Sequence, residues 1–163
     1  MKADHEELVL RNPALGACAF WHFSRMYSDY SSGRAPELPC FFIAAGMIFH
    51  GRTVDKTFRM NFDSGVLKAV SERPEIVAGL QGRMEDYAQV TLLSLQVASD
   101  SGILRREGSD GFPVFRAMGI DLPKPVRLAE RSVSDIFSCA KRLGAWFAAE
   151  PIENIGKHLM IEF

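Results

Sequence analysis

The feature that most constrains the fold is a helical pattern in Asp86–Met118 that stops at a glycine and leads into a hairpin. Gly102 follows the helical pattern, where a helix end favours a residue that adopts positive φ. Two short runs, Ile103–Arg106 and Phe112–Arg116, then flank the turn-rich residues 107–111, as in a β-hairpin with a longer loop. This order predicts the second half of a winged-helix unit. The apolar helix face is predicted from residues three or four positions apart: Tyr87, Val90, Leu93, Val97 and Ala98.

The segments on both sides of this unit predict further helices. Asn12 is a favoured N-cap before Pro13, so a first helix should begin there and end near Gly33. The apolar run Cys40–Phe49 fits a buried helix or a buried strand, and we favour a helix. Shorter helices are expected at Val54–Met60, at Gly65–Arg73, from Pro74 through Met84, and at Val133–Glu150 with Ser134 as its cap. The extended segment Ile120–Pro125 should link the hairpin to the last of these.

The predicted fold class is therefore mainly α with a small β-hairpin. A winged-helix-like core spans about 74–118, and additional helices at about 12–73 and 133–163 flank it. At 163 residues, with 47% apolar and 24% charged residues, the chain has the size and composition of a single globular domain.

Several features predict a cytoplasmic protein without a membrane segment. The longest apolar run, residues 38–49, is about a dozen residues, whereas a spanning helix needs roughly 20. The polar and acidic N-terminus lacks the apolar core of a signal peptide. Cys18, Cys40 and Cys139 are far apart among apolar neighbours, which suits buried, reduced thiols.

No catalytic, metal-binding or cofactor-binding motif is present. The four histidines stand alone, without neighbours at metal-ligand spacing, and neither a nucleophile elbow nor a phosphate-binding glycine loop occurs. We therefore expect no enzyme, no metal and no cofactor. A small enzyme that no motif reveals is the third hypothesis.

The charge pattern bears on DNA binding, which a winged helix suggests. The helix between Asp86 and Ser101 contains no Lys or Arg, so it offers almost no electrostatic attraction to phosphates, and the formal net charge of the chain is −1. Acidic residues share the hairpin loop with three arginines that are able to grip a phosphate backbone: Arg105, Arg106 and Arg116. A winged-helix DNA-binding transcription regulator is therefore the alternative function, and it predicts strongly salt-dependent duplex binding.

Aromatic residues instead favour contacts with another protein. The chain holds 12 Phe, 2 Trp and 3 Tyr, and aromatic side chains are enriched at the centres of interfaces. Taken singly, Trp21, Phe41, Phe42 and Trp146 are better explained as core residues, and only together do they favour a partner. The residues predicted to bind partners are Trp21, Tyr27, Arg105, Arg106, Phe112, Arg116 and Trp146.

Several motifs together resemble a known family, the middle component of bacterial three-component ABC systems. The motifs are Asn12–Ala17 with Phe20-Trp21-x-Phe23 and Tyr27, then Leu38-Pro39, then Leu92–Gln96 leading to Gly102–Leu104, and finally Ala140–Ala148. The last of these resembles the KLGxWFA segment of that family.

The resemblance implies a non-catalytic adaptor. Its partners would be an SMC- or RecN-like ABC ATPase and an effector subunit, often a nuclease, in a complex that defends bacteria against phage and plasmids. DNA would be contacted only indirectly or through the hairpin.

Overall fold

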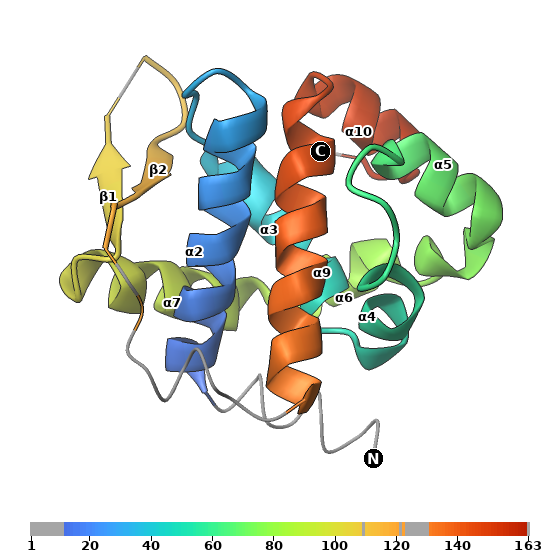
Figure 1. Ribbon diagram of the computed structural model, residues 1–163, viewed down its shortest axis with the longest axis horizontal. Helices are drawn as coiled ribbons and strands as arrows, with labels where there is room; N and C mark the ends of the chain where they lie inside the picture. Colours follow the sequence, from blue (N-terminus) through green and yellow to red (C-terminus); the bar gives the residue numbers. More distant parts are fainter. Residues whose placement is uncertain (1–11, 109, 121, 123–130, 163) are drawn as a thin grey trace.

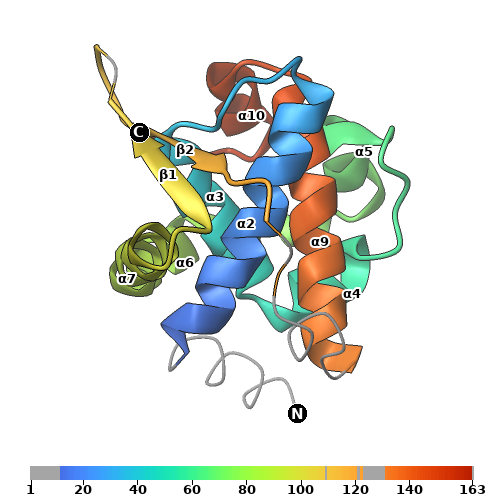
Figure 2. The same ribbon diagram turned by 60° about the vertical axis from the view of Figure 1, so that its left-hand side comes forward.

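Two long helices, α2 (Pro13–Tyr30) and α9 (Arg131–Ala148), lie side by side and run in the same direction through the middle of the molecule (Figure 1, Figure 2). The computed structural model describes residues 12–108, 110–120, 122 and 131–162. Along the helix pair, the His22 ring lies 4.7 Å from the Phe137 ring. Near the other end, Arg34 just after α2 donates from Nη2 to the carbonyl oxygen of Ala148 at 3.3 Å.

The two helices approach closely because Gly144 of α9 has no side chain. A Cβ at this position would overlap the carbonyl oxygen of Phe23 and would lie 3.1 Å from Cβ of Met26. The Phe23 ring in turn packs edge-on against the rings of Phe41 and Phe147. The centre of the fold is therefore a backbone-to-backbone contact enclosed by aromatic rings.

The sequence signals at the ends of α2 act as predicted. Asn12 Oδ1 accepts a hydrogen bond from the Leu15 N–H at 3.2 Å, and Pro13 occupies the first turn. The helix ends before Ser32 and Gly33, which have φ angles of 59° and 91°. The predicted first helix is confirmed at both ends.

The apolar run after Leu38 forms helix α3 (Leu38–Ile48), so the choice of helix over strand is confirmed. Nearly all of α3 is buried, which explains why its sequence shows no polar face. The Phe41 ring lies 5.3 Å from the Phe20 ring and 5.4 Å from the Phe115 ring of the hairpin. Helix α3 thus joins the central helix pair to the hairpin.

Shorter helices pack around α9 and the end of α3: α4 (Gly51–Thr57), α5 (Gly65–Glu72), the 3-10 turn η1 (Pro74–Ile76), α6 (Leu80–Asp86) and α10 (Ile152–His158). The prediction of one continuous helix from Pro74 through Met84 is wrong. Gly79 adopts a φ of 73°, which a right-handed helix does not accommodate, and it separates η1 from α6.

The predicted cap of the last long helix is also wrong. Helix α9 begins at Arg131, so Ser134 lies inside its first turns rather than before them. Most of the predicted linker Ile120–Pro125 lies outside the described residues.

Helix α7 (Ala88–Asp100) is followed by the hairpin as the sequence predicts. Gly102 has a φ of 81°, and the antiparallel strands β1 (Leu104–Glu107) and β2 (Val114–Ala117) pair with Arg105 opposite Arg116. The mainly helical fold with a two-stranded hairpin is confirmed. In the described ranges, no helix is both long and apolar enough to cross a membrane.

Candidate functional site

The outer face of α7 carries three large apolar side chains that are not buried by the rest of the chain. Leu92 is 51% exposed, Leu93 45% and Val97 37%. We call these three residues the apolar ridge. The opposite face of α7 is buried and contains Val90, Thr91, Ser94, Leu95 and Ala98. Helix α7 is therefore apolar on two sides, only one of which faces the core.

Helix α7 is held in this orientation by its crossing with α2. At the crossing, Ser94 faces Gly16, and a Cβ on Gly16 would overlap the Ser94 hydroxyl. The Ser94 Oγ is buried and has no hydrogen-bond partner among the residues that the structure describes. Such close contact leaves no room for a larger residue on either side, so the buried face of α7 is fixed and the apolar ridge points outward.

A groove of about 420 Å³ runs beside the apolar ridge, between α7, the hairpin and the start of α3. Five of its lining residues are apolar, and Leu92 belongs to both the groove and the apolar ridge. The groove is lined by Leu38, Leu92, Leu95, Gln96, Ser99, Asp100, Arg106, Pro113 and Phe115. Ridge and groove together form a continuous surface of mostly apolar character.

Two of the three hairpin arginines are paired within the hairpin. Glu107 accepts from Arg105 Nη2 at 2.8 Å and from Arg116 Nε at 3.0 Å. These two guanidiniums lower the pKa of the Glu107 carboxyl below its usual value. Arg116 also donates from Nη1 to the carbonyl oxygen of Gly33 at 2.7 Å. The third arginine, Arg106, points to the other face of the hairpin and lines the groove.

The other predicted partner-binding residues divide into two groups. Phe112, at the hairpin tip, is exposed. Trp21, Tyr27 and Trp146 are buried. Trp21 Nε1 donates to the Met118 carbonyl oxygen at 3.0 Å, and Trp146 Nε1 donates to the Asn61 carbonyl oxygen at 3.2 Å. The four hairpin residues therefore lie on one small element but not on one face of it, and the other three lie in the core.

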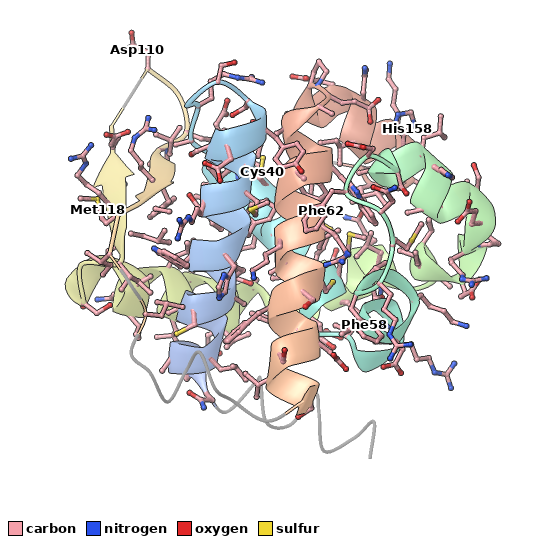
Figure 3. The ribbon with its side chains drawn as sticks, viewed as in Figure 1. Cys40, Phe58, Phe62, Asp110, Met118 and His158 are labelled. Carbon is pink, nitrogen blue, oxygen red and sulfur yellow. The ribbon has the colours of Figure 1, made fainter. Side chains whose placement is uncertain are left out.

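The sequence pattern did not identify the apolar ridge. The apolar face that the sequence predicts for α7 includes Leu93 and Val97, whereas in the structure these two are exposed and Ser94 is buried. The sequence does contain one indication of the ridge, because α7 has more apolar residues than a single buried helix face can hold. In Figure 3, the labels of Asp110 in the hairpin loop and Met118 just after β2 show where the hairpin lies.

A second cleft, of about 510 Å³, lies between α4, η1 and α6 and is lined mainly by polar and charged residues. Lys56 Nζ and Glu75 Oε1 lie 3.3 Å apart in it. Arg83 donates to the carbonyl oxygens of Gly46, Ile76 and Ala78, which fixes its guanidinium to the ends of neighbouring helices. Lys56 and Arg83 of this cleft thus have protein partners.

The described residues offer little nucleophilic or metal chemistry. Burial raises the pKa of the Cys40 and Cys139 thiols to about 12, and it also raises the pKa of Cys18. A protonated thiol is a poor nucleophile and a poor metal ligand at neutral pH. Within the described ranges, no group of three or more His, Cys, Asp or Glu residues has the arrangement of a metal site.

One titration is expected to affect stability. Burial, assisted by the charges of Lys141 and Arg25, lowers the pKa of His22 to about 4. The unfolded chain binds a proton at His22 near its ordinary pKa of about 6.5, and the folded chain does not until about pH 4, so acidification favours unfolding. The free energy of unfolding should therefore fall by about 2–3 kcal/mol between pH 6.5 and pH 4 because of this residue.

Urea denaturation at a series of pH values measures this effect. The variant His22→Gln, which has no titrating ring, is expected to lose correspondingly less stability over the same range. Equal pH profiles for both proteins would contradict the assigned role of His22.

These features define a mainly helical protein with an apolar helix face next to a basic hairpin. The family model described as ABC-three component (ABC-3C) system Middle Component 3 matches residues 1–163, and the chain belongs to this family. The resemblance seen in the sequence is thereby confirmed. No curated protein and no solved structure matches the chain significantly. As a component of a multi-component ABC system, the chain has protein partners.

Proposed function

We propose that this chain is a non-catalytic adaptor that bridges an SMC- or RecN-like ABC ATPase and an effector subunit, often a nuclease, in a complex that defends bacteria against phage and plasmids. Membership of a middle-component family supports a role between two other subunits. The single observation that carries the proposal is the apolar ridge on α7, which the chain itself leaves uncovered.

The apolar ridge has the chemistry of a protein interface. Covering its three half-exposed side chains would contribute roughly 3 kcal/mol by the apolar area removed from water. The residues between Asp86 and Ser101 contain no cation, and Asp86 and Asp100 flank the ridge with negative charge. A phosphate backbone would be repelled there, whereas an apolar protein surface would be accommodated.

We also propose that residues 74–118 form a winged-helix-like unit within one domain spanning 1–163. The order of two helices, α6 and α7, followed by an antiparallel hairpin supports this interpretation. A DNA-binding regulator built on the same unit is less well supported, because Glu107 neutralises part of the charge of Arg105 and Arg116. Any contact of the hairpin with DNA would depend mainly on Arg106.

A test is to measure binding of the purified full chain to the ABC ATPase and to the effector encoded beside it. We expect the variant Leu93→Glu to lose at least about 100-fold in affinity for one of the two subunits, because a carboxylate would be buried in an apolar contact. The matched control is Leu67→Glu on α5. Leu67 is 56% exposed, so the same change is made at a position with similar exposure outside the ridge.

The alternative outcomes separate the two functions. Failure of the wild-type chain to bind either subunit would overturn the adaptor role. Salt-dependent binding of the isolated chain to duplex DNA, abolished by Arg105→Glu together with Arg106→Glu, would favour the DNA-binding regulator instead.

A further inference from the structure

The two strands of the hairpin differ in how their outer edges are occupied. Along β2, the Phe115 N–H donates to the Pro36 carbonyl oxygen at 3.1 Å. The Ser24 hydroxyl donates to the Phe115 carbonyl oxygen at 2.6 Å and accepts from the Ala117 N–H at 3.1 Å. The outer edge of β2 is therefore closed by α2 and by the segment before α3.

The outer edge of β1 is open at Arg106. Met118 N–H donates to the Ile103 carbonyl oxygen at 2.9 Å. In an antiparallel pair, the backbone groups of alternate residues point to the partner strand, so those of Ile103, Arg105 and Glu107 point toward β2. The intervening residues, Leu104 and Arg106, point their N–H and C=O groups away from β2. Leu104 is only 2% exposed, so the accessible N–H and C=O groups are those of Arg106. Among the residues that the structure describes, these outward-pointing backbone groups have no partner. Figure 1 shows β1 on the outside of the molecule, with β2 between it and α2, and Figure 2 shows the same order.

An open edge strand is a template for a further strand, because it offers backbone donors and acceptors at strand spacing. The exposed side chain of Arg106 stands at this edge and also lines the groove beside α7. Phe115 lies directly opposite Arg106 in the hairpin, so both side chains are on the face that looks into the groove. A strand added to β1 would thus place alternate side chains next to Arg106 and the apolar groove.

The charged side chains at the outer edge of β1 determine which kind of strand can pair with it. A second copy of this chain, paired antiparallel through Leu104 and Arg106, would need the backbone of Leu104, which is buried. It would also bring Arg105 opposite Arg105 of that copy, and like charges directly opposite each other are destabilising. An acidic side chain placed beside Arg106 would be attracted instead. An apolar side chain two positions away on the same face would enter the groove, whose walls include Leu92 and Phe115.

We propose that the outer edge of β1 binds an extended segment of a partner subunit as a third strand, and that this segment carries an acidic and an apolar residue two positions apart. The proposal rests on the adaptor function and specifies how one partner is held. Backbone hydrogen bonds to Arg106 hold the segment, and the Arg106 side chain with the groove selects its sequence.

A pair of variants at one position separates the backbone contribution from the charge. Arg106→Ala removes the guanidinium and keeps the N–H, whereas Arg106→Pro removes both and leaves the β1–β2 hydrogen bonds of Arg105 and Glu107 in place. Binding of the full chain to the purified ATPase and effector subunits is measured for both. We expect a loss of about 3- to 10-fold for Arg106→Ala and a further loss of about 10-fold or more for Arg106→Pro.

Hydrogen exchange on the wild-type chain gives a second measurement that does not depend on the folding of a variant. In the free chain, the amides of Arg105 and Glu107 should exchange slowly and that of Arg106 quickly. On addition of the partner subunit, the Arg106 amide should become protected.

The outcomes distinguish this inference from the adaptor role. If the wild-type chain binds neither subunit, both fail. If it binds and Leu93→Glu abolishes binding, while Arg106→Pro binds as well as Arg106→Ala and the Arg106 amide stays fast, the strand-addition proposal is overturned and the adaptor role stands. Protection of Arg106 in a dimer of the chain alone would also overturn it, because the occupant would then be a second copy.

Discussion

Replacing Gly144 by alanine is expected to lower the free energy of unfolding by about 2–4 kcal/mol, although alanine is the better helix former. The added methyl group would overlap the Phe23 carbonyl oxygen, a backbone atom that cannot rotate away. Phe23 is itself held by the rings of Phe41 and Phe147, so α2 has no room to withdraw. To remove this overlap, α2 and α9 would have to move apart and lose packing along their contact.

Urea denaturation of the purified chain measures this change, and Gly82→Ala is its matched control. Gly82 lies inside α6, and a Cβ there would meet no atom within 4 Å. This control variant should gain up to about 1 kcal/mol from helix propensity alone. If both variants shifted stability in the same direction, the close contact of α2 with α9 would not be the reason that position 144 is a glycine.

Replacing Trp146 by alanine is expected to cost about 3–5 kcal/mol of stability in the isolated chain. Trp146 is 1% exposed, so its removal leaves a large cavity in the core. Its Nε1–H also donates to the Asn61 carbonyl oxygen at 3.2 Å, which fixes the segment between α4 and α5 to α9. The smaller change Trp146→Phe keeps most of the volume and removes this hydrogen bond, so it should cost about 1–2 kcal/mol.

The comparison with Phe112→Ala distinguishes a core residue from a surface residue. Phe112 is 55% exposed, and its truncation should change the stability of the isolated chain by less than about 1 kcal/mol. Trp146→Phe is expected to bind the ATPase and effector subunits like the wild-type chain as long as it is folded. A folded Trp146→Phe variant that failed to bind would indicate a direct role for this tryptophan in a partner contact.

The parts of the fold that local chemistry determines were predictable. Asn12 with Pro13 marked the start of α2, and Gly33 and Gly102 marked helix ends by the positive φ that glycine tolerates. The apolar run of α3 indicated burial on all sides. The predicted helix from Pro74 through Met84 runs through Gly79, whereas Gly79 adopts a positive φ and ends the helix there, because no local feature of the sequence distinguishes a glycine inside a helix from a glycine that ends one.

The candidate site was predictable only in part, because exposure depends on contacts between distant segments. On α7, the sequence offers two apolar faces, and the close contact of Ser94 with Gly16 decides which of them is buried. The pairing of Glu107 with two arginines could have been predicted from the sequence. Glu107 is two positions from Arg105, and the hairpin register places Arg116 opposite Arg105, so all three share one face.

The parallel course of α2 and α9 has an electrostatic consequence. Their backbone dipoles point the same way and repel one another side by side, and the partial negative charges of both carboxyl ends gather at one end of the pair. Arg34 stands at that end. It donates from Nε to the Ser31 carbonyl oxygen at 3.4 Å and from Nη2 to the Ala148 carbonyl oxygen at 3.3 Å. One guanidinium thereby neutralises the ends of two helices that would otherwise favour an antiparallel arrangement.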